Sequence, residues 1–200
     1  MDPTRPSEVK AWCLARGFHP NRTLGQNFLV DRHILEAIVS AAALPPGAAV
    51  LEVGPGLGAV TQALLDASAR VTAVEKDHRL ADWLRRTLGT EPRFTLIEGD
   101  MLEVPLDGLL TDSAAAGRPR FYACVSNLPY ASGTRILLEL CRHPLCPGTL
   151  VVTVQREVAE RLAAGPRAPA RGQAGVWVQQ DFDVTLLRTI KPACFWPRPE

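Results

Sequence analysis

The stretch AAVLEVGPGLGAVT, residues 48–61, decides the fold of this chain. It opens with a run of apolar residues, which is typical of a strand buried on both faces of a parallel sheet. Three glycines follow at positions 54, 56 and 58, and a helical pattern begins directly after them. A buried strand that passes through a glycine turn into a helix predicts a sheet of parallel strands connected by helices.

The same alternation of strands and helices continues along the chain. Further strands are predicted over residues 70–77, 93–100, 120–127, 149–155 and 183–191, and helices over 58–68, 78–89, 132–143 and 173–181. Two helices precede the first strand, over 7–16 with Ser7 as N-cap and over 31–44 with Asp31 as N-cap. The sequence therefore predicts an α/β fold with a doubly wound, mostly parallel sheet and helices on both faces.

Length and composition narrow the class of protein. A chain of 200 residues with 46% hydrophobic and 22% charged residues suits one soluble domain. It has no apolar run long enough for a membrane span and no secretory signal at its N-terminus. The five cysteines form no C-x-x-C pair, which predicts reduced thiols in the cytoplasm and no metal site. We expect a cytoplasmic monomer; the net charge of +1 is low for a nucleic-acid-binding protein, although a small sum can hide a basic face.

Residues suited to binding a cofactor stand at the ends of the predicted strands. The carboxyl ends of parallel strands form the ligand crevice of such a sheet. Gly54 and Gly56 let a ligand lie against the backbone at a helix N-terminus. Glu75 follows at the end of the next strand, about 20 residues later, where a carboxylate can bind ribose hydroxyls. The third strand ends in Asp100, so we expect an adenosine-containing cofactor whose adenine amine is bound by Asp100.

Two cofactors remain open at this point. A nicotinamide dinucleotide favours the pattern G-x-G-x-x-G, but the third glycine comes one position early here. That spacing and the preceding Glu52 favour S-adenosylmethionine (SAM), whose charged part is an amino acid. Asp100 could instead be an ordinary turn or helix-capping residue.

The fourth predicted strand ends in VSNLPYAS, residues 125–132. These residues suit methyl transfer to the exocyclic nitrogen of adenine. The Asn127 side-chain oxygen and the Pro129 carbonyl can accept the two N–H bonds of the amine, and the proline ring holds its carbonyl rigidly. Tyr130 offers a flat surface on which the base can stack. The alternative is a simple turn that ends the strand.

The motifs together resemble the KsgA/Erm family of ribosomal RNA adenine N6,N6-dimethyltransferases. The resemblance runs from about residue 20 to the end of the chain and is carried by LGQNFLVD (24–31), LEVGPGLGAVT (51–61), AVEKD (73–77), EGDML (98–102), VSNLPY (125–130), VQREVAERLAAGP (154–166) and FWPRP (195–199). Their order and spacing match the family. The resemblance implies a Rossmann-like SAM-dependent methyltransferase domain over 31–200, after an N-terminal helix and a segment leading to the cofactor over 1–30.

The resemblance also implies roles for particular residues. Those implied to contact SAM are Gln26, Asn27, Leu29, Gly54, Gly56, Glu75, Asp100 and Asn127. Phe195 is implied to pack against the target base opposite Tyr130, the alternative being an ordinary core aromatic. Without the resemblance, Asn27 would be read as a loop residue.

Within this family, KsgA-like enzymes dimethylate two adjacent adenosines in a hairpin loop of small-subunit ribosomal RNA. The N-terminal helix and GQNFLVD (25–31) resemble that branch more than the Erm branch, which methylates large-subunit RNA. A target base must leave its stack to reach such a pocket, which is easier in a loop. Three alternatives are an Erm-type enzyme, a DNA adenine methyltransferase, which would need a large target-recognition region, and a ribosome-assembly factor with poor catalysis.

Two features depart from the family. Arg135 replaces a proline soon after the NLPY motif, and the chain stops at Glu200, before the family's last strand and helical RNA-binding domain. We therefore expect that strand and that domain to be missing. The candidate RNA contacts that remain are Arg16, His19, Arg22, Arg135 and the basic residues of 156–171.

Overall fold

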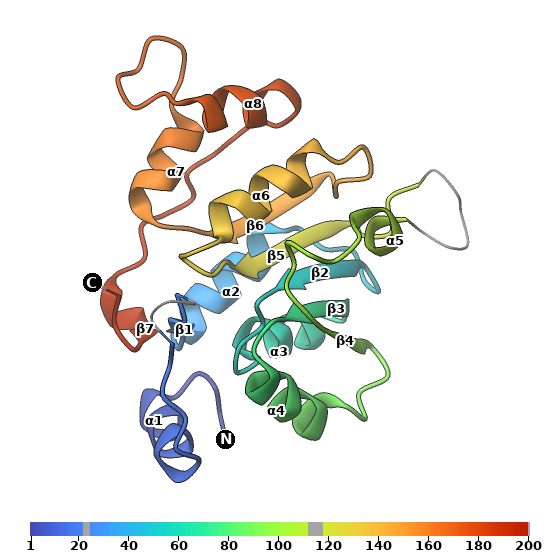
Figure 1. Ribbon diagram of the computed structural model, residues 1–200, viewed down its shortest axis with the longest axis vertical. Helices are drawn as coiled ribbons and strands as arrows, with labels where there is room; N and C mark the ends of the chain where they lie inside the picture. The colour runs from blue at the N-terminus through green and yellow to red at the C-terminus, as the bar shows by residue number, and fades with distance from the viewer. Residues whose placement is uncertain (22–24, 112–117, 200) are drawn as a thin grey trace.

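The computed structural model describes residues 1–21, 25–111 and 118–199 (Figure 1). Its centre is a five-stranded sheet in the order β4-β3-β2-β5-β6, in which all neighbours are parallel. The strands are β2 (Ala49–Val53), β3 (Arg70–Glu75), β4 (Phe94–Glu98), β5 (Ala123–Asn127) and β6 (Thr149–Thr153). These strands confirm the first five that the sequence predicts.

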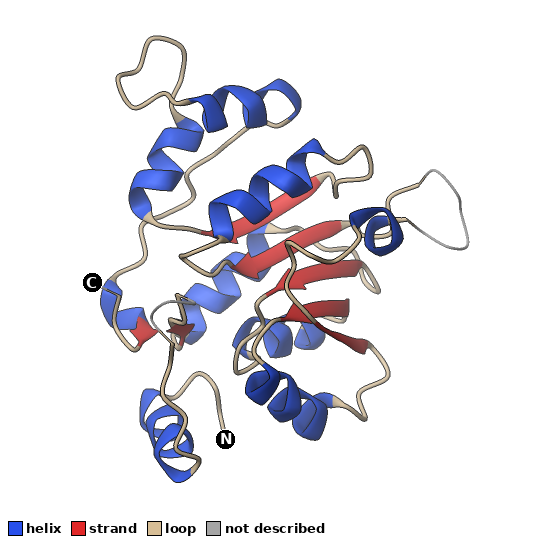
Figure 2. Cartoon of the chain, in the orientation of Figure 1, coloured by secondary structure: helices blue, strands red, loops and turns tan. Residues whose placement is uncertain are grey.

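Helices cover both faces of this sheet (Figure 2), as the doubly wound prediction requires. One face carries α2 (Arg32–Ala41), α3 (Ala59–Asp66) and α4 (His78–Leu88); the other carries α5 (Leu106–Leu110) and α6 (Gly133–Arg142), with α7 (Arg156–Ala163) and α8 (Gln173–Asp181) beyond α6. Apolar residues at helical spacing, such as Ile136 and Leu140 of α6, face the sheet and are buried. Among the described residues, no helix is long and apolar enough to cross a membrane.

The strand order places the ligand crevice between β2 and β5. From β2 the chain winds outward through β3 to β4, then returns to the other side of β2 and continues through β5 to β6. The crevice of such a sheet opens at the carboxyl ends of the strands where this direction reverses. The glycine turn after β2 and the NLPY motif after β5 therefore come to lie side by side.

A second, two-stranded sheet was not anticipated from the sequence. Strand β1 (Phe28–Leu29) pairs antiparallel with β7 (Phe195–Trp196), which follows the 3₁₀ turn η1 (Pro192–Cys194). Leu29 lies opposite Phe195 in this pairing. Strands of two residues carry too little pattern to be recognised in a sequence.

Two details of the predicted elements are wrong. The segment 183–191 has no partner strand in the described structure, and its Leu186 and Leu187 are 53% and 61% exposed. An extended segment becomes a strand only when a neighbour pairs with its backbone. Helix α1 (Pro6–Ala15) begins after Arg5 rather than Ser7, because the fixed φ of Pro6 suits the first helical position.

Helix α1 docks on α4 through an aromatic cluster. Trp12 packs edge-on against Trp83 of α4, with the ring centroids 5.1 Å apart, and against Phe18 at 5.4 Å. Phe18 in turn neighbours Phe28, which stacks with Trp196. This cluster fixes the chain on either side of the segment that leads into the ligand crevice.

Candidate active site

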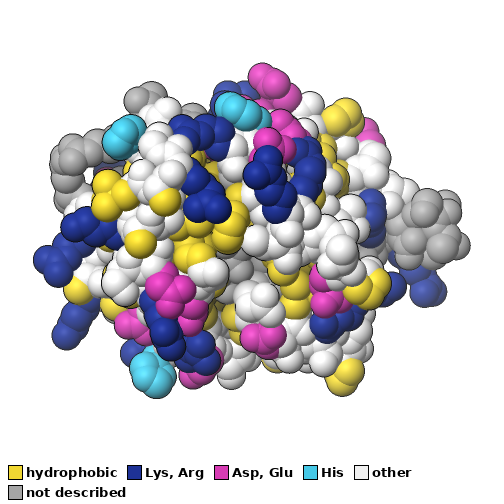
Figure 3. Space-filling view, turned by 90° about the horizontal axis from the view of Figure 1, so that it is seen from below, with side chains coloured by type: hydrophobic (Ala, Val, Ile, Leu, Met, Phe, Trp, Pro, Cys, Tyr) yellow, Lys and Arg dark blue, Asp and Glu magenta, His cyan; other side chains and the backbone are white. Residues whose placement is uncertain are grey.

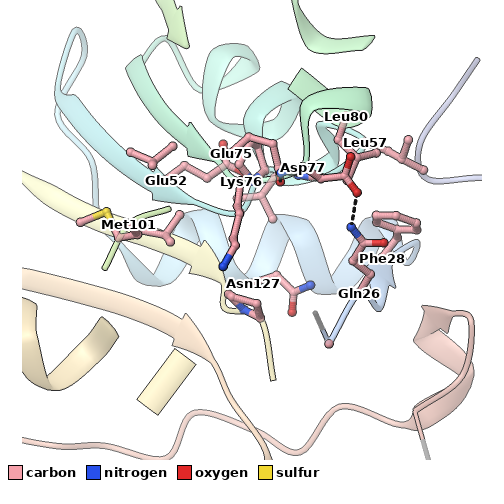
Figure 4. Close-up of a pocket in the computed structure, with 18 of the residues that line it drawn as sticks. Gln26, Phe28, Glu52, Leu57, Glu75, Lys76, Asp77, Leu80, Met101 and Asn127 are labelled. Carbon is pink, nitrogen blue, oxygen red and sulfur yellow. Dashed lines mark hydrogen bonds between the residues drawn. The ribbon is translucent and has the colours of Figure 1, made fainter. Parts of the chain in front are cut away.

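A cavity of about 220 Å³ lies at the carboxyl edge of the sheet (Figure 4). Its walls come from the segment 25–29 and from the ends of β2, β3, β4 and β5. Every residue predicted to bind the cofactor lines it, together with Pro129: Gln26, Asn27, Leu29, Gly54, Gly56, Glu75, Asp100 and Asn127. The structure thus brings this predicted set together around one cavity.

The glycine turn after β2 has the backbone shape that glycine permits. Gly54 and Gly56 have φ values of +67° and +60°, in the left-handed region. A Cβ on Gly56 would also lie only 3.1 Å from the ring of Phe28. Glycine at this position therefore leaves the cavity open where a side chain would be both strained and crowded.

Glu75 is held by the backbone on both sides. Its Oε2 accepts the Gly56 N–H at 3.0 Å, and its Oε1 accepts the Asp77 N–H at 2.8 Å. Burial raises the pKa of Glu75, and these backbone donors oppose that effect. The backbone N–H groups of the glycine turn and of Asp77 therefore fix its carboxylate in the wall of the cavity.

Glu52 is a second buried carboxyl in the wall of the cavity. Its Oε2 accepts the Thr61 hydroxyl at 2.7 Å. Burial, with a smaller contribution from Glu75, raises the pKa of Glu52 from 4.5 to about 8. A cation in the cavity would favour the ionised form of both carboxyl groups.

Asp100 follows β4 and begins a turn. Its Oδ1 accepts the Leu102 N–H at 3.0 Å, and its Oδ2 lies 2.6 Å from the Lys76 ammonium. Lys76 is the main reason that the pKa of Asp100 is lowered. Asp100 is thus a turn residue that also faces the cavity, so the two interpretations of it are compatible.

The segment before β1 is tied to the sheet by side-chain hydrogen bonds. The Gln26 amide donates to Asp77 at 2.9 Å, which is the dashed contact in Figure 4. The Asn27 carbonyl accepts the Asn127 amide, also at 2.9 Å. Leu29 is buried in β1. Asn27 thus contributes its backbone to the contact with the NLPY motif.

Asn127 at the end of β5 has both ends of its side-chain amide engaged. The nitrogen donates to Asn27, and the oxygen accepts the hydroxyl of Thr153. Thr153 lies opposite Asn127 in the β5–β6 register. The sequence analysis missed Thr153, although a polar residue at the end of the adjacent strand was an available signal.

Pro129 lines the cavity, but its carbonyl serves the helix that follows. It accepts the N–H groups of Gly133 at 2.7 Å and Ser132 at 3.2 Å at the start of α6. Two donors occupy the two lone pairs of a carbonyl oxygen. This differs from the predicted role, in which that oxygen accepts a substrate amine.

Tyr130 and Phe195 meet beside the cavity. Their ring centroids are 6.5 Å apart, with the planes at 68° to each other. Phe195 is 6% exposed and packs in the core cluster that includes residues of α2. A Cβ on Gly25 would lie 2.6 Å from the Tyr130 nitrogen, so the segment 25–27 packs tightly against the NLPY motif.

Lys76 was also missed by the sequence analysis. In the view of Figure 4 its side chain leaves the end of β3 and points toward Asn127, and its ammonium pairs with Asp100. Its position between Glu75 and Asp77, next to a predicted ribose-binding carboxylate, was the available signal. It is the one Lys or Arg among the described residues that line the cavity, which also holds Glu52, Glu75, Asp77 and Asp100.

The basic residues proposed for RNA contact differ in whether other side chains of the protein already contact them. Arg16 lies over the rings of Trp12 and Trp83, and Arg156 is paired with Glu160. Arg135 is exposed at the start of α6, whereas Arg22 lies outside the described residues. On the face seen in Figure 3, Lys and Arg side chains are interspersed with Asp and Glu. The described part of this face thus carries mixed charge, in line with the net charge of +1.

Within residues 1–21, 25–111 and 118–199, no group of three or more His, Cys, Asp and Glu side chains is arranged to hold a metal ion.

Comparison with known proteins identifies relatives over nearly the whole chain. The family profile described as ribosomal RNA adenine dimethylase matches residues 17–200. Proteins named ribosomal RNA small subunit methyltransferase A match at 40% identity in Opitutus terrae, over 99% of this chain and 70% of the relative, and at 40% in Geobacter metallireducens, over 92% and 66%. The chain thus spans about two thirds of the length of these curated relatives.

Solved structures agree with the sequence relatives. A dimethyladenosine transferase from Plasmodium falciparum superposes with a TM-score of 0.71 at 25% identity, over 85% of this chain and 58% of the other. The 23S rRNA methyltransferase ErmE superposes with a TM-score of 0.69 at 28% identity, over 87% and 66%. With a profile match over residues 17–200 and relatives at 40% identity, the chain belongs to the ribosomal RNA adenine dimethylase family.

Proposed function

We propose that this chain transfers methyl groups from SAM to the exocyclic N6 of adenosines in ribosomal RNA. The observation that carries the proposal is the placement of the Asn127 amide at the edge of the acidic cavity, beside the Tyr130–Phe195 ring pair. Membership of the ribosomal RNA adenine dimethylase family supports the same chemistry.

The charge of the cavity favours SAM over a dinucleotide. Four carboxyl groups and one ammonium line it, and the buried Glu52 and Glu75, whose pKa values are raised, ionise more readily beside a cation, so the cavity suits a cationic ligand better than a pyrophosphate. A ligand with a sulfonium and an α-ammonium group would instead be attracted. Glu75 and Asp100 present acceptors for ribose hydroxyls and for an adenine amine, and the open glycine turn gives the ligand room beside the backbone.

The chain's own residues position the target amine. When bound, SAM supplies a methyl group activated by its sulfonium. The Asn127 oxygen can accept one N–H of the adenine amine with the lone pair that Thr153 leaves free. Pro129 fixes the turn through its carbonyl, so we assign it to positioning the motif. The methylated amine gives up its proton readily, so catalysis relies mainly on orientation.

The ring pair offers a place for the target base. Tyr130 supplies a stacking face, and Phe195 is held beside it by the pairing of β1 with β7. The base must leave its stack to reach this place, which favours an unpaired loop of the RNA. Arg135, exposed at the start of α6, is the proposed phosphate contact.

The substrate proposed is a pair of adjacent adenosines in a hairpin loop of small-subunit RNA, modified during ribosome biogenesis. Relatives named for the small subunit, at 35–40% identity, support this choice. An Erm-type large-subunit substrate is the second candidate, favoured by the likeness to ErmE. We further propose a cytoplasmic monomer without a metal, in which residues 1–30 lead into the cofactor domain.

The test is direct methylation by this chain. SAM and unmethylated small subunits are incubated with it, and the digested RNA is analysed for N6,N6-dimethyladenosine by mass spectrometry. We expect product, reduced about 10²–10³-fold in Asn127→Ala because a positioned hydrogen-bond partner of the reacting group is lost.

A parallel reaction with large ribosomal subunits shows which of the two candidate substrates the chain methylates. A preparation that is folded and binds SAM but methylates neither subunit would contradict the enzymatic proposal. It would favour a poorly catalytic assembly factor.

A further inference from the structure

The feature that the proposed function leaves unused is the ion pair of Lys76 with Asp100. The two residues follow β3 and β4, and their charged atoms lie 2.6 Å apart in the wall of the cavity. The Lys76 side chain is 57% exposed and the Asp100 side chain 17%. The ammonium therefore reaches from the solvent side to a carboxylate that faces the cavity.

The two carboxylates that flank Lys76 in the chain accept hydrogen bonds from other residues. Glu75 accepts backbone N–H groups of Gly56 and Asp77. Asp77 accepts the Arg79 N–H and the Gln26 amide. Lys76 thus pairs with Asp100 although two acidic residues flank it in the chain.

Asp100 is fixed from two directions. The Leu102 N–H holds Oδ1 and the Lys76 ammonium holds Oδ2. Each oxygen keeps one lone pair for a further donor. Because the turn and the ion pair act on different oxygens, the plane of the carboxylate cannot rotate freely.

We propose that Lys76 is a positioning residue for the cofactor. It holds the Asp100 carboxylate in the orientation in which it accepts a hydrogen bond from the exocyclic amine of adenine. The cavity therefore selects a purine that carries an amino group over one that carries a carbonyl oxygen in place of that amine. This inference rests on the proposed use of SAM. An amino group donates to a carboxylate, whereas a carbonyl oxygen would face it with like partial charge. Removing the ammonium frees the carboxylate to rotate and so weakens this selection.

The chain offers a matched control in Arg85 and Glu98. This pair also joins a basic side chain to a carboxylate near the end of β4, two residues before Asp100, but neither residue lines the cavity. A general effect of removing a surface charge would appear in Arg85→Met as well as in Lys76→Met.

Calorimetry with the full 200-residue chain tests the proposal. The ligands are S-adenosylhomocysteine (SAH) and its hypoxanthine analogue, S-inosylhomocysteine, and the melting temperature of each variant is recorded. We expect Lys76→Met to bind SAH about tenfold more weakly and to lose about tenfold in preference for SAH over the analogue, since a charge-assisted contact is removed. Lys76→Arg should keep most of the preference for SAH over the analogue. Arg85→Met should have the same affinity and preference as the wild type.

The outcomes separate the inference from the function on which it rests. If the wild type binds SAH and Lys76→Met keeps the same affinity and preference, the role of Lys76 is overturned while the cofactor site stands. If Lys76→Met lowers the affinity for SAH and for the analogue by the same factor, Lys76 contributes charge but no selection between them, and the proposal is again overturned. A wild type that binds neither SAH nor SAM would refute the proposed function itself.

Discussion

The site has two halves, the cavity proposed for the cofactor and the place beside it proposed for the target base, and they are assembled in different ways. In the cofactor half, Glu75 accepts the backbone N–H groups of Gly56 and Asp77, and Asp100 accepts that of Leu102. In the half proposed for the base, Asn127 is held by Asn27, a hundred residues away. Tyr130 likewise meets Phe195 near the end of the chain.

This difference predicts how the halves respond to change. The carboxylates of the cofactor half come from the strand ends of the parallel sheet, with the segment 25–29 closing the cavity, whereas the base half also needs Phe195, which the pairing of β1 with β7 holds in place. Changes in the second half should therefore affect RNA and turnover while leaving cofactor affinity nearly intact. Two variants test that separation, and a third tests the protonation of a carboxyl group in the cofactor half.

The largest effect on the use of RNA is expected from Tyr130→Ala. Loss of a stacking face costs about 1–3 kcal/mol per base, so KM for the RNA should rise about ten- to a hundredfold. SAM affinity, measured by calorimetry, should change by less than twofold. The chain has one other tyrosine, Tyr122, which is exposed just before the start of β5, and Tyr122→Ala is the matched control. If Tyr130→Ala lowered the affinity for SAM by the same factor as it raised KM for the RNA, the two halves would not be independent.

A smaller effect is expected from Thr153→Val. The variant keeps the shape of the side chain but removes the hydroxyl that donates to Asn127. A lost hydrogen bond of about 0.5–1.5 kcal/mol predicts a kcat roughly three- to tenfold lower, with SAM affinity unchanged. Thr149→Val, at the start of the same strand, controls for changes in β6. Equal rates in Thr153→Val and Thr149→Val would show that Asn127 needs no partner in β6.

Glu52→Gln tests the cofactor half through the dependence of protein stability on pH. The folded protein raises the pKa of Glu52 from 4.5 to about 8, so it binds this proton more tightly than the unfolded chain. The stability that Glu52 contributes is complete below pH 4.5 and is lost as pH rises toward 8, by at most about 1.4 kcal/mol per pH unit.

Gln cannot lose a proton, so the variant should lack this decline. Urea unfolding of the ligand-free protein at pH 6, 7 and 8 measures it, with Glu139→Gln on the exposed side of α6 as control. Parallel stability curves for Glu52→Gln and the wild type would contradict the pKa assigned to Glu52.

The same contrast explains what could be predicted from the sequence. The glycine turn, Glu75 and Asp100 follow apolar strands, and parallel strands bring their ends together, so these residues could be placed from spacing, whereas Gln26, Asn27 and Leu29 were implied only by the family resemblance. The strands β1 and β7 depend on a contact between segments far apart in the sequence, which no local pattern records. The predicted strand 183–191 has strand-like composition, but composition does not supply the neighbour that a strand requires.

The pairing of Phe28 with Trp196 also sets an order of events during synthesis. As the chain leaves a translating ribosome, the cofactor half can form once β6 has emerged, because all five strands of the sheet are then available. The base half must wait until residues 195 and 196 have cleared the exit tunnel. A nascent chain could thus hold its methyl donor before the ring pair proposed to receive the target base has formed.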